Sequence, residues 1–251
     1  MHPALLLARR ALRTILPKPL ALALRREWLV RGVVSGRAYR EGDVDVLGRF
    51  VHAGDVVWDI GANSGTYMLA LSRLAARVCA FEPVPHNTEI LERVIRRAGL
   101  HNVTTSDLAL SDAPGTARMA IPTLGFYGGY SMAALDQEGD LPVSVATIDQ
   151  LIADGWPEPS FIKCDVEGVE EKVVNGARDL IARRQPIWLL ETFEEELIPL
   201  MHSLGYVAYA NIRGKGEFRR VTARMPTERN YWFFPPGINP LSRAREHHST
   251  T

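Results

Sequence analysis

The chain has 251 residues, of which 46% are hydrophobic and 23% charged, and its formal net charge is zero. This is the composition of an ordinary globular protein, and the length suits one α/β domain with additions or at most two small domains. The charge is uneven, because residues 1–40 hold nine Lys and Arg against the single acid Glu27, whereas the rest holds twenty basic and twenty-eight acidic residues. The acidic body counts against a nucleic acid substrate, and no apolar run is long enough for a bilayer-spanning helix.

The two cysteines, Cys79 and Cys164, each lie inside an apolar, strand-like run, where a thiol behaves as a small hydrophobe. We therefore expect both to be reduced and the protein to be cytoplasmic. A secretory signal is not expected, because basic residues interrupt the early apolar segment instead of preceding it.

Residues 1–45 form a predicted basic, helical N-terminal extension. One face of the predicted helix is apolar and carries Leu5, Leu12, Ile15 and Leu16. Another face is basic and carries Arg9, Arg10 and Arg13. Two interpretations remain open at this point. The helix packs on the domain, or it contacts a membrane surface or a partner, which would make the protein membrane-peripheral.

Apolar strands alternate with amphipathic helices over residues 46–236, the predicted main domain. The predicted strands are 55–60, 77–81, 103–110, 117–121, 160–165, 186–191, 206–212 and 231–234. The predicted helices are 66–76, 85–98, 169–183 and 194–204. This alternation is typical of a parallel sheet with helices on both faces.

Two segments do not follow the alternation. Residues 123–140, rich in glycine and aromatic residues, are predicted to form a mobile loop. Residues 237–251 are predicted to be a disordered tail.

The most informative segment is a buried strand, a glycine turn and a helix start over residues 56–67. A dinucleotide site requires Gly-x-Gly-x-x-Gly, whose middle glycine lets the backbone approach a pyrophosphate. The turn here reads Gly61-Ala62-Asn63-Ser64-Gly65, with Asn63 in place of the middle glycine. The pattern therefore favours S-adenosylmethionine, which has a ribose and a charged methionine tail but no phosphate.

Acidic residues follow the first three strands. Asp59 and Glu82 end the first two, so their carboxylates meet at the carboxyl edge of the sheet, where open α/β folds bind ligands. We expect Glu82 to accept hydrogen bonds from the ribose hydroxyls, and Asp59 to hold the turn or meet the cofactor's ammonium group. Asp107, after the third strand, is placed to reach an adenine amino group. The alternatives are a helix cap for Asp59, a surface carboxylate for Glu82 and a turn residue for Asp107.

A second signal is Phe161-Ile162-Lys163-Cys164-Asp165-Val166-Glu167-Gly168. The apolar strand brings Asp165 to the same edge, beside the glycine turn, and strand alternation places Lys163 on the same face. We predict that Asp165, Glu167 and Lys163 orient and deprotonate the acceptor. The alternatives are a solvated amine for Lys163 and helix-start carboxylates for the two acids. Metal-ligand spacing is absent, so no metal is expected.

These segments, together with Ala80-Phe81-Glu82-Pro83, Leu108-Ala109-Leu110-Ser111 and Ala146-Thr147-Ile148-Asp149, resemble the FkbM family of S-adenosylmethionine-dependent methyltransferases. The resemblance implies a class I methyltransferase (Rossmann-like) fold, with a seven-stranded sheet whose last strand is antiparallel. It also implies O-methylation of a hydroxyl on a sugar, glycolipid or secondary metabolite. The predicted cofactor-binding residues are Asp59, Gly61, Ala62, Asn63, Tyr67, Glu82, Pro83, Asp107, Leu108 and Asp165.

Two other functions remain open from the sequence. One is a nucleotide-dependent oxidoreductase, which the missing middle glycine disfavours. The other is a non-catalytic, methyltransferase-like scaffold that binds a partner through its basic N-terminus. The acids at the sheet edge favour an enzyme whose acceptor is a small molecule or a glycan, with no nucleic acid partner.

Overall fold

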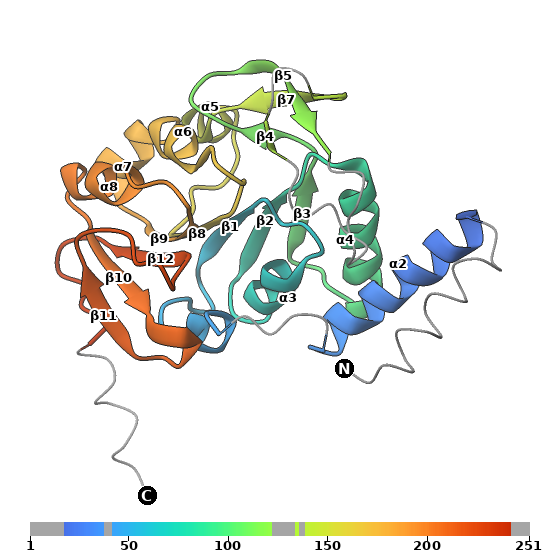
Figure 1. Cartoon of the computed structure of the whole chain (residues 1–251), viewed down its shortest axis with the longest axis horizontal. Coiled ribbons are helices and arrows are strands. Elements are labelled where there is room, and N and C mark those ends of the chain that lie inside the picture. The colour runs from blue at the N-terminus through green and yellow to red at the C-terminus, as the bar shows by residue number, and fades with distance from the viewer. Residues whose placement is uncertain (1–17, 38–41, 122–133, 136–138, 242–251) are drawn as a thin grey trace, which may run out of the picture.

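A large central sheet organises the protein. The computed structural model describes residues 18–37, 42–121, 134–135 and 139–241. The sheet has eight strands in the order β11-β10-β12-β9-β8-β1-β2-β3 (Figure 1). In chain order they are β1 (Val56–Ile60), β2 (Arg77–Phe81), β3 (Val103–Ser106), β8 (Phe161–Cys164), β9 (Ile187–Glu191), β10 (Val207–Asn211), β11 (Phe218–Val221) and β12 (Asn230–Phe234).

The strand directions match the expected arrangement. Strands β3, β2, β1, β8 and β9 pair in parallel, and the last strand, β12, is antiparallel to both β9 and β10. Strand β11 pairs antiparallel with β10 at the edge, which extends the expected seven strands to eight. The two final apolar segments are therefore neighbours in the sheet, with β11 between them in sequence.

Helices cover both faces of the sheet. Successive strand residues point to opposite sides, so the apolar strands present hydrophobic side chains on both faces. Val57 of β1 enters one core with the helices α2 and α3, and Trp58 enters the other with α6, α7 and α8. The helices are α2 (Lys18–Val34), α3 (Thr66–Ser72), α4 (Pro85–Ala98), α5 (Ile148–Ala153), α6 (Glu170–Asn175), α7 (Arg178–Arg184) and α8 (Leu197–Ser203), with the 3-10 turns η1 (Val44–Arg49) and η2 (Ile212–Gly214). The prediction of a doubly covered α/β sheet is confirmed.

The predicted strand 103–110 is wrong as a single strand. The chain leaves the central sheet after Ser106, whose Oγ accepts a hydrogen bond from the Leu108 N–H at 3.3 Å. The next residues form a second, four-stranded sheet in the order β4-β7-β5-β6 (Figure 1). Its strands are β4 (Ala109–Leu110), β5 (Gly115–Ala120), β6 (Ala134–Leu135) and β7 (Leu141–Ala146). Strand β7 and helix α5 were not predicted.

The predicted helix 169–183 is two helices, α6 and α7. Gly176 separates them and lies so close to the Ser111 carbonyl that an added Cβ would be 2.1 Å from its oxygen. Asp149 then starts α7, because its carboxylate accepts hydrogen bonds from the Asp179 and Leu180 N–H groups, each at 2.9 Å. The break therefore follows from close packing and a cap supplied by a distant residue.

The two segments predicted to be irregular are each described only in part. Most of residues 123–140 lies outside the described residues, but Ala134 and Leu135 pair with β5 and so are not loop. Residues 237–241 of the predicted tail pack on the domain, and the Arg49 Nη2 donates to the Pro240 carbonyl at 2.6 Å. Residues 242–251 lie outside the described residues.

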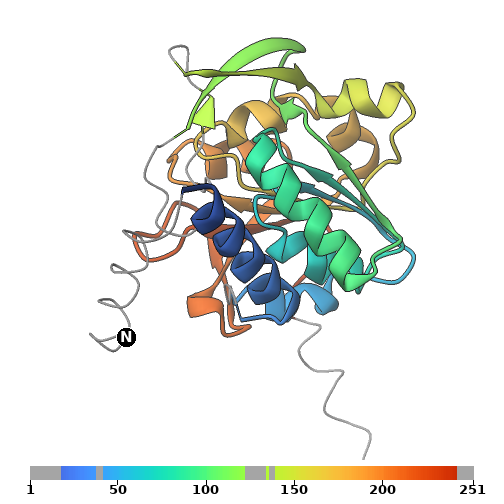
Figure 2. The ribbon, with the colours of Figure 1, turned by 90° about the vertical axis from the view of Figure 1, so that its right-hand side faces the viewer.

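Helix α2 docks on the domain, as one of the two interpretations of the N-terminal segment expects. Its Leu29, Val30 and Val33 are at most 4% exposed and belong to the core beside α4. Figure 2 shows α2 and α4 side by side. The predicted faces of residues 5–16 lie outside the described residues. Within the described part of the chain, no helix has both the length and the hydropathy needed to cross a membrane.

Asp43 anchors the segment before β1 to the far half of the sheet. It is 6% exposed, and its carboxylate accepts hydrogen bonds from Asn211 Nδ2 at 3.1 Å, Asn230 Nδ2 at 3.0 Å and Trp232 Nε1 at 2.6 Å. Asp43 therefore ties the segment before β1 to the central sheet.

We expect Asp43→Ala to lower the free energy of unfolding by about 2–3 kcal/mol, because three buried donors lose their acceptor. Urea denaturation would measure the loss, with the exposed Asp154→Ala as control. A loss no larger than that of the control would show that Asp43 is not an anchor.

Candidate functional site

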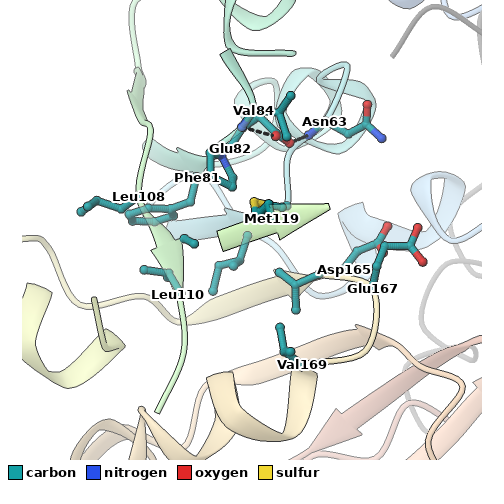
Figure 3. Close-up of a pocket in the computed structure, with 15 residues that line it drawn as sticks. Asn63, Phe81, Glu82, Val84, Leu108, Leu110, Met119, Asp165, Glu167 and Val169 are labelled. Atoms are coloured by element: carbon teal, nitrogen blue, oxygen red, sulfur yellow. Dashed lines mark hydrogen bonds between the residues drawn. The ribbon is translucent and has the colours of Figure 1, made fainter. Parts of the chain in front are cut away.

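A pocket opens at the carboxyl ends of β1, β2 and β8, with residues of β4 and β5 on its other side (Figure 3). Strand β1 lies between β2 and β8, so the crossover connections on its two sides run to opposite halves of the sheet. This is the switch point at which open α/β sheets bind ligands. The pocket is lined by Ile60, Gly61, Asn63, Phe81, Glu82, Pro83, Val84, Leu108, Ala109, Leu110, Met119, Asp165, Val166, Glu167 and Val169.

The glycine turn after β1 forms the floor between β2 and β8. The N–H groups of Gly61 and Ala62 donate to the Phe81 carbonyl at 2.9 and 3.0 Å. Gly61 has a φ of 78°, and an added Cβ would be 1.8 Å from the Asp165 carbonyl oxygen. Only glycine fits here, because the conformation and the close approach both exclude a side chain.

Glu82 is held rigidly at the end of β2. Its carboxylate accepts hydrogen bonds from the Asn63 N–H at 2.8 Å and from the Val84 N–H at 2.9 Å, and the residue is 4% exposed (Figure 3). Burial raises the pKa of Glu82, and the two backbone bonds oppose that rise. Asn63 has a φ of 48°, which turns its N–H toward the carboxylate. The Asn87 side chain also hydrogen-bonds this carboxylate, and a carboxylate has about four lone-pair sites, so Glu82 keeps capacity for a hydrogen bond from a ligand.

Lys163 and Asp165 lie together, as strand alternation predicts. The Lys163 Nζ is 3.5 Å from an Asp165 carboxylate oxygen and 4.9 Å from the centroid of the Tyr67 ring. Lys163 is 1% exposed, whereas the Asp165 side chain is 31% exposed and lines the pocket. The prediction that Lys163 acts on an acceptor therefore finds no support in its position. The amine lies behind the pocket wall and holds Asp165 in place.

The loop after β8 presents Glu167. Its φ is 56° and that of Gly168 is 100°, so the chain turns sharply. The buried Glu170 carboxylate fixes this turn by accepting hydrogen bonds from the Val166 N–H at 3.0 Å and the Gly168 N–H at 3.1 Å. Sequence reasoning missed Glu170, which is the first residue of α6 and whose carboxylate turns back onto the loop before it.

The electrostatics of this loop affect Glu167 most clearly. Partial burial, and the neighbouring acids Asp165 and Glu170, raise the pKa of Glu167 to about 6. Figure 3 shows Asp165 and Glu167 close together on the opposite side of the pocket from Glu82. A carboxylate with a pKa near neutrality suits proton transfer.

The predicted site residues divide into two groups. Gly61, Asn63, Glu82, Pro83, Leu108, Asp165 and Glu167 line the pocket. The other group does not line it: Asp59, Ala62, Tyr67 and Lys163 are buried, and Asp107 is exposed. Within the described residues, no group of three or more His, Cys, Asp or Glu side chains is arranged to hold a metal ion.

Sequence reasoning missed the apolar wall of the pocket. Phe81 and Leu110 come from strands, and Met119 comes from β5 of the second sheet. Alternation within 117–121 predicted a strand but gave no indication of where that strand would pack.

Comparison with known proteins identifies the family. The model of the methyltransferase FkbM domain matches residues 59–208, which run from β1 to the start of β10. The chain belongs to the FkbM methyltransferase family. The resemblance predicted from the motifs is thereby confirmed.

Two curated FkbM-family relatives are similar over part of their length. The hexuronic acid methyltransferase AglP of Haloferax volcanii is 32% identical over 123 residues, which are 49% of each chain. The 31-O-demethyl-FK506 methyltransferase FkbM of Streptomyces tacrolimicus is 29% identical over 187 aligned positions, which take in 61% of this chain and 69% of the relative. The chain thus spans about half the length of AglP.

A solved structure supports the fold of this family member. The crystal structure of methyltransferase FkbM from Methylobacillus flagellatus KT gives a TM-score of 0.50 at 16% identity, over 84% of this chain and 59% of that chain. At this identity the similarity shows the fold alone. The class I methyltransferase fold is confirmed.

One motif of the family resemblance has a structural explanation. In Ala146-Thr147-Ile148-Asp149, the Thr147 Oγ1 caps α5 by accepting from the Gln150 N–H at 3.0 Å, and Asp149 caps α7. The motif therefore joins two helices on one face of the sheet and lies outside the pocket lining.

Proposed function

We propose that this protein transfers a methyl group from S-adenosylmethionine to a hydroxyl oxygen of a sugar, glycolipid or secondary metabolite. The observation that carries the proposal is the Glu82 carboxylate, fixed by two backbone N–H groups at the switch point, with Asp165 and Glu167 across the same pocket. Membership of a methyltransferase family supports it.

The residues of the pocket fit this cofactor. Glu82 offers acceptor capacity to the two ribose hydroxyls, and the apolar side chains of Phe81, Leu110 and Met119 suit an adenine ring. Asp165 suits the positive charge of the sulfonium and methionine ammonium groups. The described lining has no Lys, Arg or His side chain to pair with a phosphate, which disfavours a dinucleotide.

The bound cofactor supplies an electrophilic methyl group, so the protein has to align the acceptor and receive one proton. We assign the proton to the Glu167 carboxylate, which is partly exposed and whose pKa of about 6 suits a base. Asp165, held by Lys163, keeps negative charge beside the reacting centre. Glu167 would take the proton of the acceptor hydroxyl as the methyl group of the bound cofactor is transferred to its oxygen.

The names of the relatives support an oxygen-bearing acceptor, and that of the FK506 enzyme supports a hydroxyl. One relative is named as a methyltransferase of a hexuronic acid and the other as one of 31-O-demethyl-FK506. These names cover a sugar and a secondary metabolite, two of the three classes proposed here. Incubation with radiolabelled S-adenosylmethionine and a panel of sugars, glycolipids and hydroxylated metabolites would identify the acceptor by label incorporation.

We expect calorimetric titration to show binding of S-adenosylhomocysteine and none of NAD. The reason is the Asn63 turn, which leaves no glycine where a pyrophosphate would approach, together with the uncharged or acidic lining. Binding of NAD without S-adenosylhomocysteine would establish the oxidoreductase alternative, and binding of neither would favour the scaffold.

A further inference from the structure

Helix α2 has one face committed to the domain. Leu29 and Val30 are each 1% exposed and Val33 is 4% exposed, and Arg26 forms an ion pair with Glu89 of α4. On the same side, Arg97 of α4 donates to Glu27 at 2.9 Å. These contacts fix the orientation of α2, so the opposite face points away from the protein (Figure 2).

The outward face carries a stripe of apolar side chains, formed by Leu20, Leu24 and Trp28. They are 47%, 52% and 53% exposed, and their spacing of four residues aligns them along the helix. They are three of the five large hydrophobic side chains that are exposed within the described residues. Such a concentration on one helix marks an interaction surface.

The stripe lies on the basic flank of an otherwise acidic protein. Helices α2 and α4 together contain seven basic and three acidic residues, whereas acids exceed bases after residue 40. Arg31 and Arg96 each pair with an acid one turn earlier, Glu27 at 2.7 Å and Glu92 at 3.5 Å, yet keep 66% and 67% of their side chains exposed. Figure 1 shows this helix pair at the side of the molecule opposite β10 and β11.

We propose that α2 docks this protein on the surface of an anionic lipid bilayer. The stripe of Leu20, Leu24 and Trp28 enters the boundary between headgroups and acyl chains, where an indole ring is favoured. The arginines of α2 and α4 lie beside the lipid phosphates. The charge of this flank favours an anionic bilayer as the partner. The apolar stripe matches the acyl-chain region of such a bilayer, and the arginines match its anionic headgroups. The proposal rests on α2 and α4 and is independent of methyl transfer.

Cosedimentation of the full chain with vesicles tests the proposal. We expect binding to phosphatidylcholine vesicles that contain phosphatidylglycerol, at least about tenfold weaker binding to phosphatidylcholine alone, and weaker binding as salt rises. The triple variant Leu20→Ser, Leu24→Ser, Trp28→Ser should lose at least about tenfold in affinity for the anionic vesicles. The matched control is Leu241→Ser, which removes an equally exposed apolar side chain, 50% exposed, away from α2.

Tryptophan fluorescence gives a second readout on the folded protein. Trp58, Trp188 and Trp232 are fully buried, and the partly buried Trp156 packs against Trp58 and Phe81, so a blue shift on adding anionic vesicles would report mainly Trp28. The shift should disappear in Trp28→Phe. The thermal unfolding midpoint of every variant should match that of the parent, because the substituted side chains are exposed.

Three results would overturn the proposal. The full chain fails to bind anionic vesicles, or the triple variant binds them as tightly as the control. In the third, sedimentation velocity shows a dimer that the triple variant converts to a monomer, without vesicle binding, which would make the stripe a self-association surface.

Discussion

Glu82→Ala should weaken the binding of S-adenosylhomocysteine by about 2–4 kcal/mol, which corresponds to about 30- to 1,000-fold in the dissociation constant. The variant removes a charged acceptor from the ribose hydroxyls. It also frees the N–H groups of Asn63 and Val84, which loosens the glycine turn. Isothermal titration calorimetry of the parent and variant would measure the loss.

Two controls separate recognition from loosening of the turn. Glu92→Ala removes an exposed acid of α4, whose side chain is 53% exposed, and should leave affinity unchanged. An S-adenosylhomocysteine analogue lacking the 2′-hydroxyl should bind the parent more weakly than the natural ligand does, and should show a smaller difference in Glu82→Ala. If both proteins discriminate equally between the ligands, Glu82 does not bind the ribose.

Glu82→Gln is not a mild substitution at this position. Both carboxylate oxygens accept from backbone N–H groups, so a glutamine must direct its amide N–H₂ at one of those donors. The site around Glu82 therefore requires a carboxylate.

The sequence was sufficient to predict the half of the site that lies on parallel strands. Buried parallel strands appear as apolar runs, and the residue after each run lies at the carboxyl edge. That rule placed Glu82 and Asp165 in one pocket, and the glycine pattern placed Asn63 beside them. Asp107 follows β3 in the same way, but it is exposed and outside the pocket lining, so its contact with an adenine amino group stays a prediction.

The second sheet was harder to predict because its pairings join residues far apart in sequence. Strand β4 is two residues long and pairs in parallel with the end of β7, with Ala109 opposite Val145. A pair that short has no periodicity of its own. The apolar wall that β4 and β5 contribute to the pocket was therefore not predictable from one chain.

Positions of buried polar residues were also not predictable. Lys163 was expected near the acceptor, but it is 1% exposed and pairs with Asp165 from behind. Asp43 was assigned to an N-terminal extension, yet it binds donors on β10 and β12. The Lys163–Asp165 pairing is local and was predicted, but the Tyr67 ring over the Lys163 amine and the donors around Asp43 come from segments distant in sequence, so local pattern does not predict them.

Glu167→Gln should lower the rate of methyl transfer by about 10²- to 10⁴-fold once an acceptor is known, because the base that receives the hydroxyl proton is lost. Only the carboxylate form accepts a proton. Because the pKa of Glu167 is about 6, the single-turnover rate of the parent protein should rise with pH below that value and become constant above it. The positively charged donor favours the carboxylate, so bound cofactor shifts this inflection to lower pH.

The pH profile distinguishes a base from a residue that only shapes the pocket. In Glu167→Gln the low rate should lose this inflection, while the S-adenosylhomocysteine dissociation constant stays within about threefold of the parent's, because Glu82 and the glycine turn are unchanged. Glu171→Gln, an exposed acid on α6, is the matched control and should keep the parent's profile. If Glu167→Gln retains the inflection, the titrating base is another group, and Asp165→Asn becomes the variant to measure next, since Asp165 is the other partly exposed acid in the pocket.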